Sequence, residues 1–294
     1  MAVGDLPIIG DDFRVGFRFQ RYWDTPMAIA FFCGELGAGF FLVSLLFNYV
    51  PGMIAGVLIT GLFKTYFHMS HMGVPMKSWR AILRPDRSWI SRGLLGIVFY
   101  SGFGVLHIAN SWFGLELPAG GLIKLLAAAS ALVVMTYQGF AMSHSTAISL
   151  WSSGLMPVSS FVYAATGGVM LTLAIGWNGF LAEQPDTRSL LINAALILLL
   201  AIAGILLSLL HAAHHGSPGG RKSVELLTRT FYAKWFYGLI WGAGLILPAA
   251  LLWFASGSYP AAVLAAAGVL LGYYSFRLLI FKAGVFEPIM SFRP

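Results

Sequence analysis

Apolar residues along this chain gather into long stretches separated by short polar segments. Each stretch has about the 20 residues that an α-helix needs to cross a bilayer core of about 30 Å. None alternates apolar and polar residues with a period of two, so a β-barrel is disfavoured. Eight candidate spans result: 26–49, 52–71, 93–113, 121–142, 157–181, 189–213, 235–255 and 260–282. The pattern predicts an all-α polytopic membrane protein with eight transmembrane helices.

The eight spans divide evenly into two four-helix bundles, and no repeat or low-complexity linker separates them. We therefore expect one integral membrane domain over residues 1–294. Its parts are a cytoplasmic N-terminal segment (1–25), a first bundle (26–156) and a second bundle (157–294). The small residues Gly34, Gly37 and Gly39 predict close helix packing in the first span. Pro248 predicts a kink in the seventh span.

Composition supports a membrane location and excludes several classes of protein. Of the 294 residues, 58% are hydrophobic and only 10% are charged, and the mean hydropathy is +0.80. Soluble domains carry about 25% charged residues, so a soluble enzyme, a nucleic-acid-binding protein and a disordered chain are all excluded. With Cys33 as the single cysteine, the chain cannot hold a four-thiolate Fe–S cluster or a C-x-x-C-H haem. Any electrons that pass through it must come from another subunit.

Basic residues gather on one side of the predicted membrane. That side carries Arg14, Arg18, Arg21, Lys77, Arg80, Arg84, Arg87, Arg92, Arg221, Lys222, Arg229, Lys234, Lys282 and Arg293. The opposite loops hold little beyond Arg188, with Lys124 just inside the fourth span. Because cytoplasmic loops are enriched in Lys and Arg, we expect both termini in the cytoplasm.

The two longest loops, 72–92 and 214–234, lie on this basic side and are also rich in aromatic residues. A surface of this kind can rest on anionic lipid headgroups or dock a soluble partner protein, and the sequence leaves both open. In the first loop the candidate docking residues are Arg80, Arg84, Arg87 and Arg92.

Two ionisable residues lie deep inside neighbouring spans. Counted from the outer ends of their helices, Glu35 and Lys64 each lie at a depth of about 20 Å. A charge inside a span costs roughly 2.5–3.5 kcal/mol on insertion scales, so each needs a partner or a function. We expect the two to meet, either as a structural ion pair or as a functional one. Arg277, near the inner end of the eighth span, is expected to reach the headgroups.

A stripe of ionisable side chains continues from Lys64 toward the basic side. Lys64, His68 and His71 are spaced i, i+4, i+7, which places them on one helical face. A stripe of this kind beside a buried Glu35 is typical of a proton-transfer track or of the wall of a polar pocket. Tyr137 in the fourth span lies about 24 Å deep, close to the level of His68.

Five stretches of the first half of the chain occur in a characteristic order. They are YWDTP (22–26), GELGAG (34–39), MGVPMKSWR (72–80), RPDRSWISRG (84–93) and TYQGFAM (136–142), followed by Trp151 and Pro157. In this order they resemble the membrane subunits of the NrfD/polysulfide-reductase family. The second half of the chain agrees with that family only in hydropathy and length.

The resemblance implies an eight-helix quinone-reactive subunit of the prokaryotic inner membrane that itself binds no haem, Fe–S cluster or other metal. It implies two partners, a four-cluster ferredoxin-like Fe–S subunit and a molybdopterin-containing catalytic subunit. With both termini predicted in the cytoplasm, we expect the catalytic partner there too. The phenylacetyl-CoA:acceptor oxidoreductase branch of the family is one candidate.

The resemblance also implies that the head group of a menaquinone or ubiquinone binds in the first bundle, in contact with Tyr137. The first-span histidine of the polysulfide type falls near Ala30 here and is absent. Quinone reduction needs hydrogen-bond donors and a source of two protons. The residues expected to bind quinone are Tyr137, His68, His71, Glu35 and Trp23. Those expected to transfer protons are Glu35, Lys64, His68 and His71.

Two other functions remain open at this point. A dihaem cytochrome b subunit could use His68 opposite His211 at similar depth. A proton-coupled secondary transporter could use Glu35 with Lys64, although related halves and broken helices near the midplane are not evident in the sequence.

Overall fold

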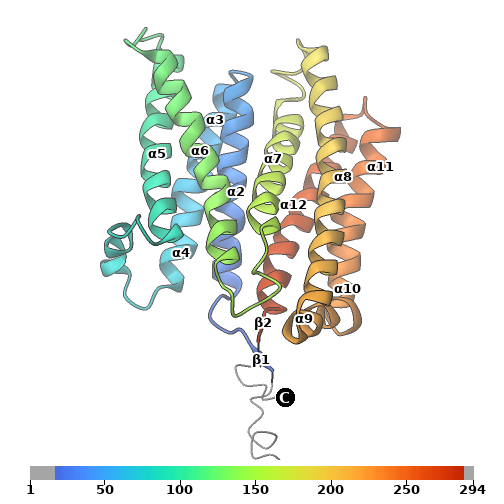
Figure 1. Cartoon of the computed structure of the whole chain (residues 1–294). Coiled ribbons are helices and arrows are strands. Elements are labelled where there is room, and N and C mark those ends of the chain that lie inside the picture. Colours follow the sequence, from blue (N-terminus) through green and yellow to red (C-terminus); the bar gives the residue numbers. More distant parts are fainter. Residues whose placement is uncertain (1–16, 288–294) are drawn as a thin grey trace, which may run out of the picture.

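The structure, a computed structural model, describes residues 17–287 and consists mainly of long helices lying side by side (Figure 1). Among these residues, eight helical segments are long and apolar enough to cross a membrane. They are α2 (Thr25–Leu46), Val50–His71, α5 (Trp89–Phe113), α6 (Gly120–Ser143), α7 (Leu155–Gly176), α8 (Pro185–Gly216), Ala233–Phe254 and α12 (Tyr259–Lys282). The eight predicted spans are confirmed, with ends that differ by a few residues. Arg14 and Arg293 lie outside the described residues.

The helix ends follow from local sequence signals. Pro26 lies in the first turn of α2, where a missing N–H breaks no hydrogen bond. Ser88 and Ser258 cap α5 and α12, their hydroxyls accepting from the amides of Ser91 and Ala261 respectively. α5 ends at Gly114, which has a left-handed φ of 60° that favours glycine.

Two of the spans contain a π-helical segment. The second span is α3 (Val50–Leu58), the π-helical η2 (Ile59–Lys64) and α4 (Thr65–His71). The seventh is α10 (Ala233–Trp235), the π-helical η4 (Phe236–Ile246) and α11 (Leu247–Phe254). A π segment has more residues per turn, so it rotates the side chains that follow it. The irregularity expected at Pro248 falls where η4 changes to α11.

α2, α7 and α12 form the buried centre of the molecule. Their most apolar windows are 78%, 67% and 61% buried, compared with 28–33% for the other five spans. α2 and α7 approach closely at Gly39, which has no side chain there. A Cβ at this position would overlap the Ala164 carbonyl. On another face of α2, Gly37 fits against Gly56 and Thr60. These contacts confirm the close packing predicted for the glycines of the first span.

The first and last described elements, β1 and β2, lie with both long basic loops at one end of the molecule (Figure 1). There β1 (Arg18–Phe19) pairs antiparallel with β2 (Val285–Phe286), with Arg18 opposite Phe286. The 3-10 helix η3 (Pro75–Ile82) and the helix α9 (Pro218–Arg229) belong to the two loops. We call this the basic end. Which side of the membrane it faces stays a prediction from loop charge.

Candidate functional site

Glu35 lies near the middle of α2 with no exposed surface, and its charged partner comes from α12. Glu35 Oε2 is 2.6 Å from Arg277 Nη2 and accepts a hydrogen bond of 2.5 Å from the Tyr273 hydroxyl. Tyr273 and Arg277 are four residues apart, so they share one face of α12. Arg277 is also fully buried and donates to Ser160 Oγ of α7 at 2.8 Å. The ion pair therefore joins α2, α7 and α12.

Two sequence-based expectations about these charges are wrong. Glu35 pairs with Arg277 and not with Lys64, and Arg277 lies inside the protein and not among headgroups. Side chains slant toward the N-terminus of their helix, and α12 begins at the end opposite the basic end. The Arg277 side chain is therefore directed toward the centre of the bundle. Counting residues gave the depths of Glu35 and Lys64 but not the direction in which each helix face turns.

Gln138 connects Glu35 to Tyr137. The amide orientation that satisfies both of its ends has Nε2 donating to Glu35 Oε1 at 3.0 Å and to the Phe31 carbonyl at 2.9 Å. In this orientation the amide oxygen accepts from the Tyr137 hydroxyl at 3.2 Å. The ring of Tyr137 lies against Gly93 of α5, where a Cβ would overlap it. A continuous hydrogen-bonded chain thus runs from Tyr137 through Gln138 to Glu35.

Lys64, the last residue of η2, lies beside Tyr137 with only 3% of its surface exposed. Its Nζ is 5.7 Å from the centroid of the Tyr137 ring. Gly34 makes room for the lysine, because a Cβ there would lie 2.9 Å from Lys64 Cδ. Within residues 17–287 the Lys64 amine has no hydrogen bond and no ion pair. Buried charges are normally paired, so this amine is suited to a partner from outside the chain.

Seven residues from five of the eight spans form what we call the polar cluster: Glu35, Lys64, Tyr137, Gln138, Ser160, Tyr273 and Arg277. Beside it, the Nε and Nη1 atoms of Arg277 and the Tyr163 hydroxyl are buried without a hydrogen-bond partner in the described part of the chain. Polar groups this deep are usually satisfied by protein or by ordered water. We therefore expect ordered water between α7 and α12 next to Arg277.

Lys64 lies on the second span, Tyr137 and Gln138 lie on the fourth, and the others lie on α2, α7 and α12. α5 contributes only the flat surface at Gly93 on which Tyr137 rests. Including that surface, six spans meet at the cluster. It is therefore built by the tertiary fold and not by any single motif.

His68 and His71 lie on α4, between Lys64 and the basic end, and both are partly buried. His71 Nδ1 is 3.1 Å from Asp24 Oδ1, so the stripe ends on a carboxylate of the segment that precedes α2. His68 Nδ1 is buried with no hydrogen-bond partner in the described residues. The stripe thus connects the level of Lys64 with the partly exposed contact between His71 and Asp24 near the basic end.

Trp23 belongs to an aromatic group near the basic end. It stacks on Trp151 with ring centroids 5.1 Å apart and makes edge contacts with Phe281 at 5.3 Å. Phe31 of α2 lies 5.2 Å from Trp23, and its carbonyl accepts from Gln138. Trp23 is therefore linked to the polar cluster through Phe31, while its expected contact with quinone stays a prediction.

Of the four candidate docking arginines, Arg80 lies on η3. Arg84 and Arg87 lie in the loop that follows it, and Arg92 lies in the first turn of α5. Arg92 donates to the Pro85 carbonyl at 2.8 Å and to the Asp86 carbonyl at 3.1 Å, so it holds the loop in shape. Arg84 and Arg87 make exposed ion pairs with Asp86, and Arg80 lies over the Trp79 ring. Exposed apolar residues accompany them: Val74, Met76, Trp79 and Leu83. This mixture fits a docking surface as well as it fits a lipid headgroup layer.

Sequence reasoning missed Gln138, Ser160, Tyr273 and Arg277 as site residues. One signal was available, because Tyr273 and Arg277 at i, i+4 place an aromatic hydroxyl and a cation on one face of a span. The pairing of His68 with His211 around a haem is wrong. Figure 1 shows α4 and α8 on opposite sides of the molecule, with α2 and α7 between them.

Comparison with known proteins supports the resemblance seen in the motifs. The family model described as polysulphide reductase, NrfD, matches residues 16–288. The match includes all eight spans, so it extends well beyond the motifs in the first half of the chain. A comparison with curated proteins found no match.

Proposed function

Because the chain belongs to the polysulphide reductase NrfD family, we propose that it exchanges electrons and protons between a docked Fe–S subunit and membrane quinone. Membership of the family implies the coarser function, that of a membrane quinone-reactive subunit of a molybdopterin oxidoreductase complex. The finer proposal concerns where the quinone binds and which groups protonate it.

The amine of Lys64, beside Tyr137 and without a partner in the described residues, carries this proposal. A quinone head group is flat and apolar, with two carbonyl oxygens that gain negative charge during reduction. A buried cation with no partner inside the described chain is suited to such an oxygen, since the interaction is strong where water is excluded. The Tyr137 hydroxyl, on the ring that lies beside the amine, supplies a second donor when it turns from Gln138 to the quinone oxygen.

The groups around this pair suit proton transfer. Full reduction of a quinone takes up two electrons and two protons, one on each oxygen. In our proposal Tyr137 gives its hydroxyl proton to one quinone oxygen and recovers a proton by exchange with Glu35 through ordered water. Gln138, hydrogen-bonded to the two side chains at 3.0 and 3.2 Å, holds them in place. His68 and His71 supply the other through Lys64, with Asp24 at the surface end of the stripe. Trp23 closes the site toward the basic end.

The basic end is the proposed docking side. Arg80, Arg84 and Arg87 expose positive charge there beside the apolar residues of η3, while Arg92 shapes the loop. We propose that a four-cluster ferredoxin-like subunit binds this surface and connects to a molybdopterin catalytic subunit. By the loop-charge rule this side is the cytoplasm, and the membrane is a prokaryotic inner membrane.

The transporter alternative loses its main support, because it required Glu35 to pair with Lys64 while Glu35 pairs with Arg277.

Replacing Lys64 tests the proposal in the assembled complex. Lys64→Met keeps the length of the side chain but removes the amine, and we expect quinone-linked electron transfer to fall about 100-fold. Since the amine makes no ion pair within residues 17–287, we expect thermal stability to stay equal or rise. Tyr137→Phe should lower the rate in the same assay.

Tyr100→Phe is the matched control. Tyr100 is also a fully buried tyrosine of the first four spans, and its hydroxyl makes a long bond of 3.4 Å to the Gly37 carbonyl. We expect this variant to keep the parental rate. If Lys64→Met keeps that rate too, or loses it only together with folding, the proposed quinone site is wrong.

A further inference from the structure

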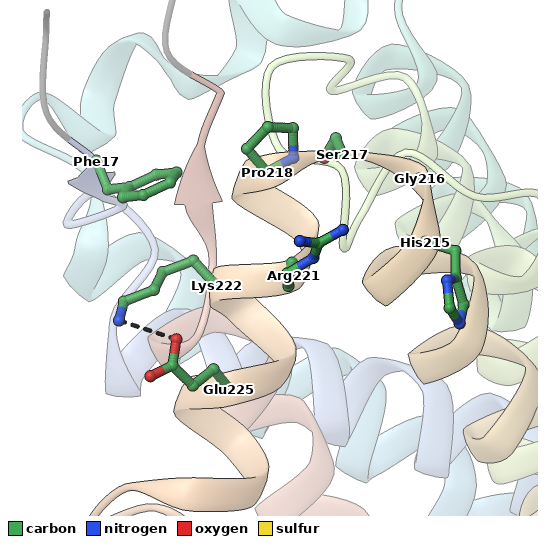
Figure 2. A pocket seen from close by; sticks show the side chains of 8 residues that line it. All are labelled: Phe17, His215, Gly216, Ser217, Pro218, Arg221, Lys222 and Glu225. Atoms are coloured by element: carbon green, nitrogen blue, oxygen red, sulfur yellow. Dashed lines mark hydrogen bonds and ion pairs between the residues drawn. The ribbon is translucent and has the colours of Figure 1, made fainter.

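A pocket of about 530 Å³ opens at the basic end, where α8 ends and α9 begins (Figure 2). It is formed by the last residues of α8, the first turns of α9 and the residue that precedes β1. The side chains that matter for its chemistry are Phe17, His215, Pro218, Arg221, Lys222 and Glu225. No member of the polar cluster lines it, so it is separate from the proposed quinone site.

Basic groups dominate this pocket. Among the described residues that line it, Glu225 is the single acid, and it is paired with Lys222, whose Nζ is 3.0 Å from Glu225 Oε2. Figure 2 shows Lys222 turned toward Glu225, while the guanidinium of Arg221 points away from that pair. Arg221 has no hydrogen bond and no ion pair among residues 17–287. One positive charge at the pocket is therefore uncompensated, with His215 beside it in the lining.

The N-terminus of α9 is already satisfied within the chain. Glu287 Oε2 accepts from the Gly219 amide at 3.1 Å, and Glu287 Oε1 accepts from the Ser217 hydroxyl. The Ser217 hydroxyl also accepts from the Gly220 amide at 3.0 Å. The helix end therefore needs no external anion, and any attraction for one comes from the side chains of Arg221 and His215.

The outer face of α8 leads from the membrane core into this pocket. Leu200, Leu207, His211 and His215 follow one another at intervals of seven, four and four residues, so they share one helical face. All four are exposed, Leu200 to 75%. From Leu200 to His215 the helix extends about 22 Å. An acyl chain lying along the two leucines would place its headgroup next to the pocket.

We propose that this pocket binds the phosphate group of an anionic phospholipid, with Arg221 as its main ligand. A guanidinium offers parallel N–H groups that match phosphate oxygens, and basic pockets at the membrane surface suit anionic headgroups. Phe17 and Pro218 provide apolar walls beside the charge. A free phosphate ion would meet the same guanidinium but would gain nothing from Leu200 and Leu207.

Native mass spectrometry of the purified complex tests the proposal, with phosphatidylglycerol and phosphatidylcholine of the same acyl chains as probes. We expect tighter binding of phosphatidylglycerol, and an approximately fivefold weaker apparent affinity in Arg221→Gln, as for one basic contact with an anionic surface. Arg229→Gln is the matched control, because Arg229 is exposed on the same helix but lies outside the pocket. We expect it to bind phosphatidylglycerol like the parent.

Four outcomes would overturn the proposal. Equal binding of the two lipids would remove the requirement for an anionic headgroup. Equal losses in Arg221→Gln and Arg229→Gln would indicate general attraction to a basic surface. Displacement of phosphatidylglycerol by an equal concentration of inorganic phosphate would identify a site for the free ion. Binding only after removal of residues 1–16 would indicate that the acidic segment with Asp11 and Asp12 occupies the pocket.

Discussion

Glu35 and Arg277 are 242 positions apart in the sequence, yet their side chains form an ion pair of 2.6 Å between α2 and α12 with neither exposed to solvent. Tyr273 and Gln138 add hydrogen bonds to the same carboxylate. The pair holds the first span against the last and fixes the position of the carboxylate that we propose as a proton carrier.

Breaking this pair on one side should destabilise the protein strongly. Arg277→Met leaves the Glu35 carboxylate buried without a countercharge, and removing one partner of a buried ion pair typically costs about 3–5 kcal/mol. We expect a large fall in the thermal unfolding temperature of the purified chain. The double variant Glu35→Gln/Arg277→Met should recover much of the loss, because no unpaired charge remains.

Arg188→Met serves as the control for that experiment, since Arg188 is a half-exposed arginine whose guanidinium lies over the Trp177 ring. We expect Arg188→Met to change the thermal unfolding temperature only slightly. If the double variant lost as much stability as Glu35→Gln and Arg277→Met together lose as single variants, the two residues would contribute independently. That result would contradict the ion pair.

The seam between α2 and α7 should not tolerate added volume. A methyl group on Gly39 would overlap the Ala164 carbonyl, so Gly39→Ala forces two backbones apart. Overpacking of this kind typically costs about 1–3 kcal/mol. Gly61→Ala is the matched control, because a Cβ there meets no atom within 4 Å. Thermal unfolding of the two variants in detergent compares them, and equal stability would contradict the close approach at Gly39.

The eight spans could be predicted from the sequence because each is a long apolar run, and the structure moves their ends by only a few residues. Counting residues along the first span also predicted the depth of Glu35. It could not identify Arg277 as the partner, because the two residues meet only through the packing of α2 against α12. The rotation of Lys64 about its helix was also hidden, since it depends on the π-helical η2.

Glu287 should make the stability of the basic end depend on pH. Partial burial favours the neutral form, but hydrogen bonds from Ser149, Ser217 and the backbone of α9 outweigh it and hold the pKa of Glu287 below its ordinary value. A carboxyl whose pKa is lowered by folding stabilises the protein above its unfolded pKa, about 4.3 for Glu. This stabilisation is lost as the pH falls through the lowered folded value.

We therefore expect Glu287→Gln to lower stability at pH 7 by about 1 kcal/mol, as for a carboxylate at a helix N-terminus. The difference from the parent should shrink once the pH falls below the ordinary glutamate range. Glu225→Gln on α9 is the control, because Glu225 makes only a partly exposed pair with Lys222. Thermal unfolding of all three proteins from pH 7 to about pH 3 measures this. A difference that grows toward acid would contradict the role of Glu287.

Docking at the basic end should depend on the arginines around η3. Reversing two charges in Arg84→Glu/Arg87→Glu should weaken association with the Fe–S subunit about tenfold, mainly by slowing association, with an effect that fades at high salt. Arg188→Glu, at the opposite end, is expected to leave association unchanged. Surface plasmon resonance of the separated subunits measures both rates, and an unchanged association rate in the double variant would place the partner elsewhere.

A map of the complex with bound quinone tests the central claim most directly. We expect one quinone oxygen at about 3 Å from Lys64 Nζ or from the Tyr137 hydroxyl, with the ring between the second and fourth spans. Quinone bound away from both side chains, with the Lys64 amine paired to another group of the complex, would contradict the proposed site.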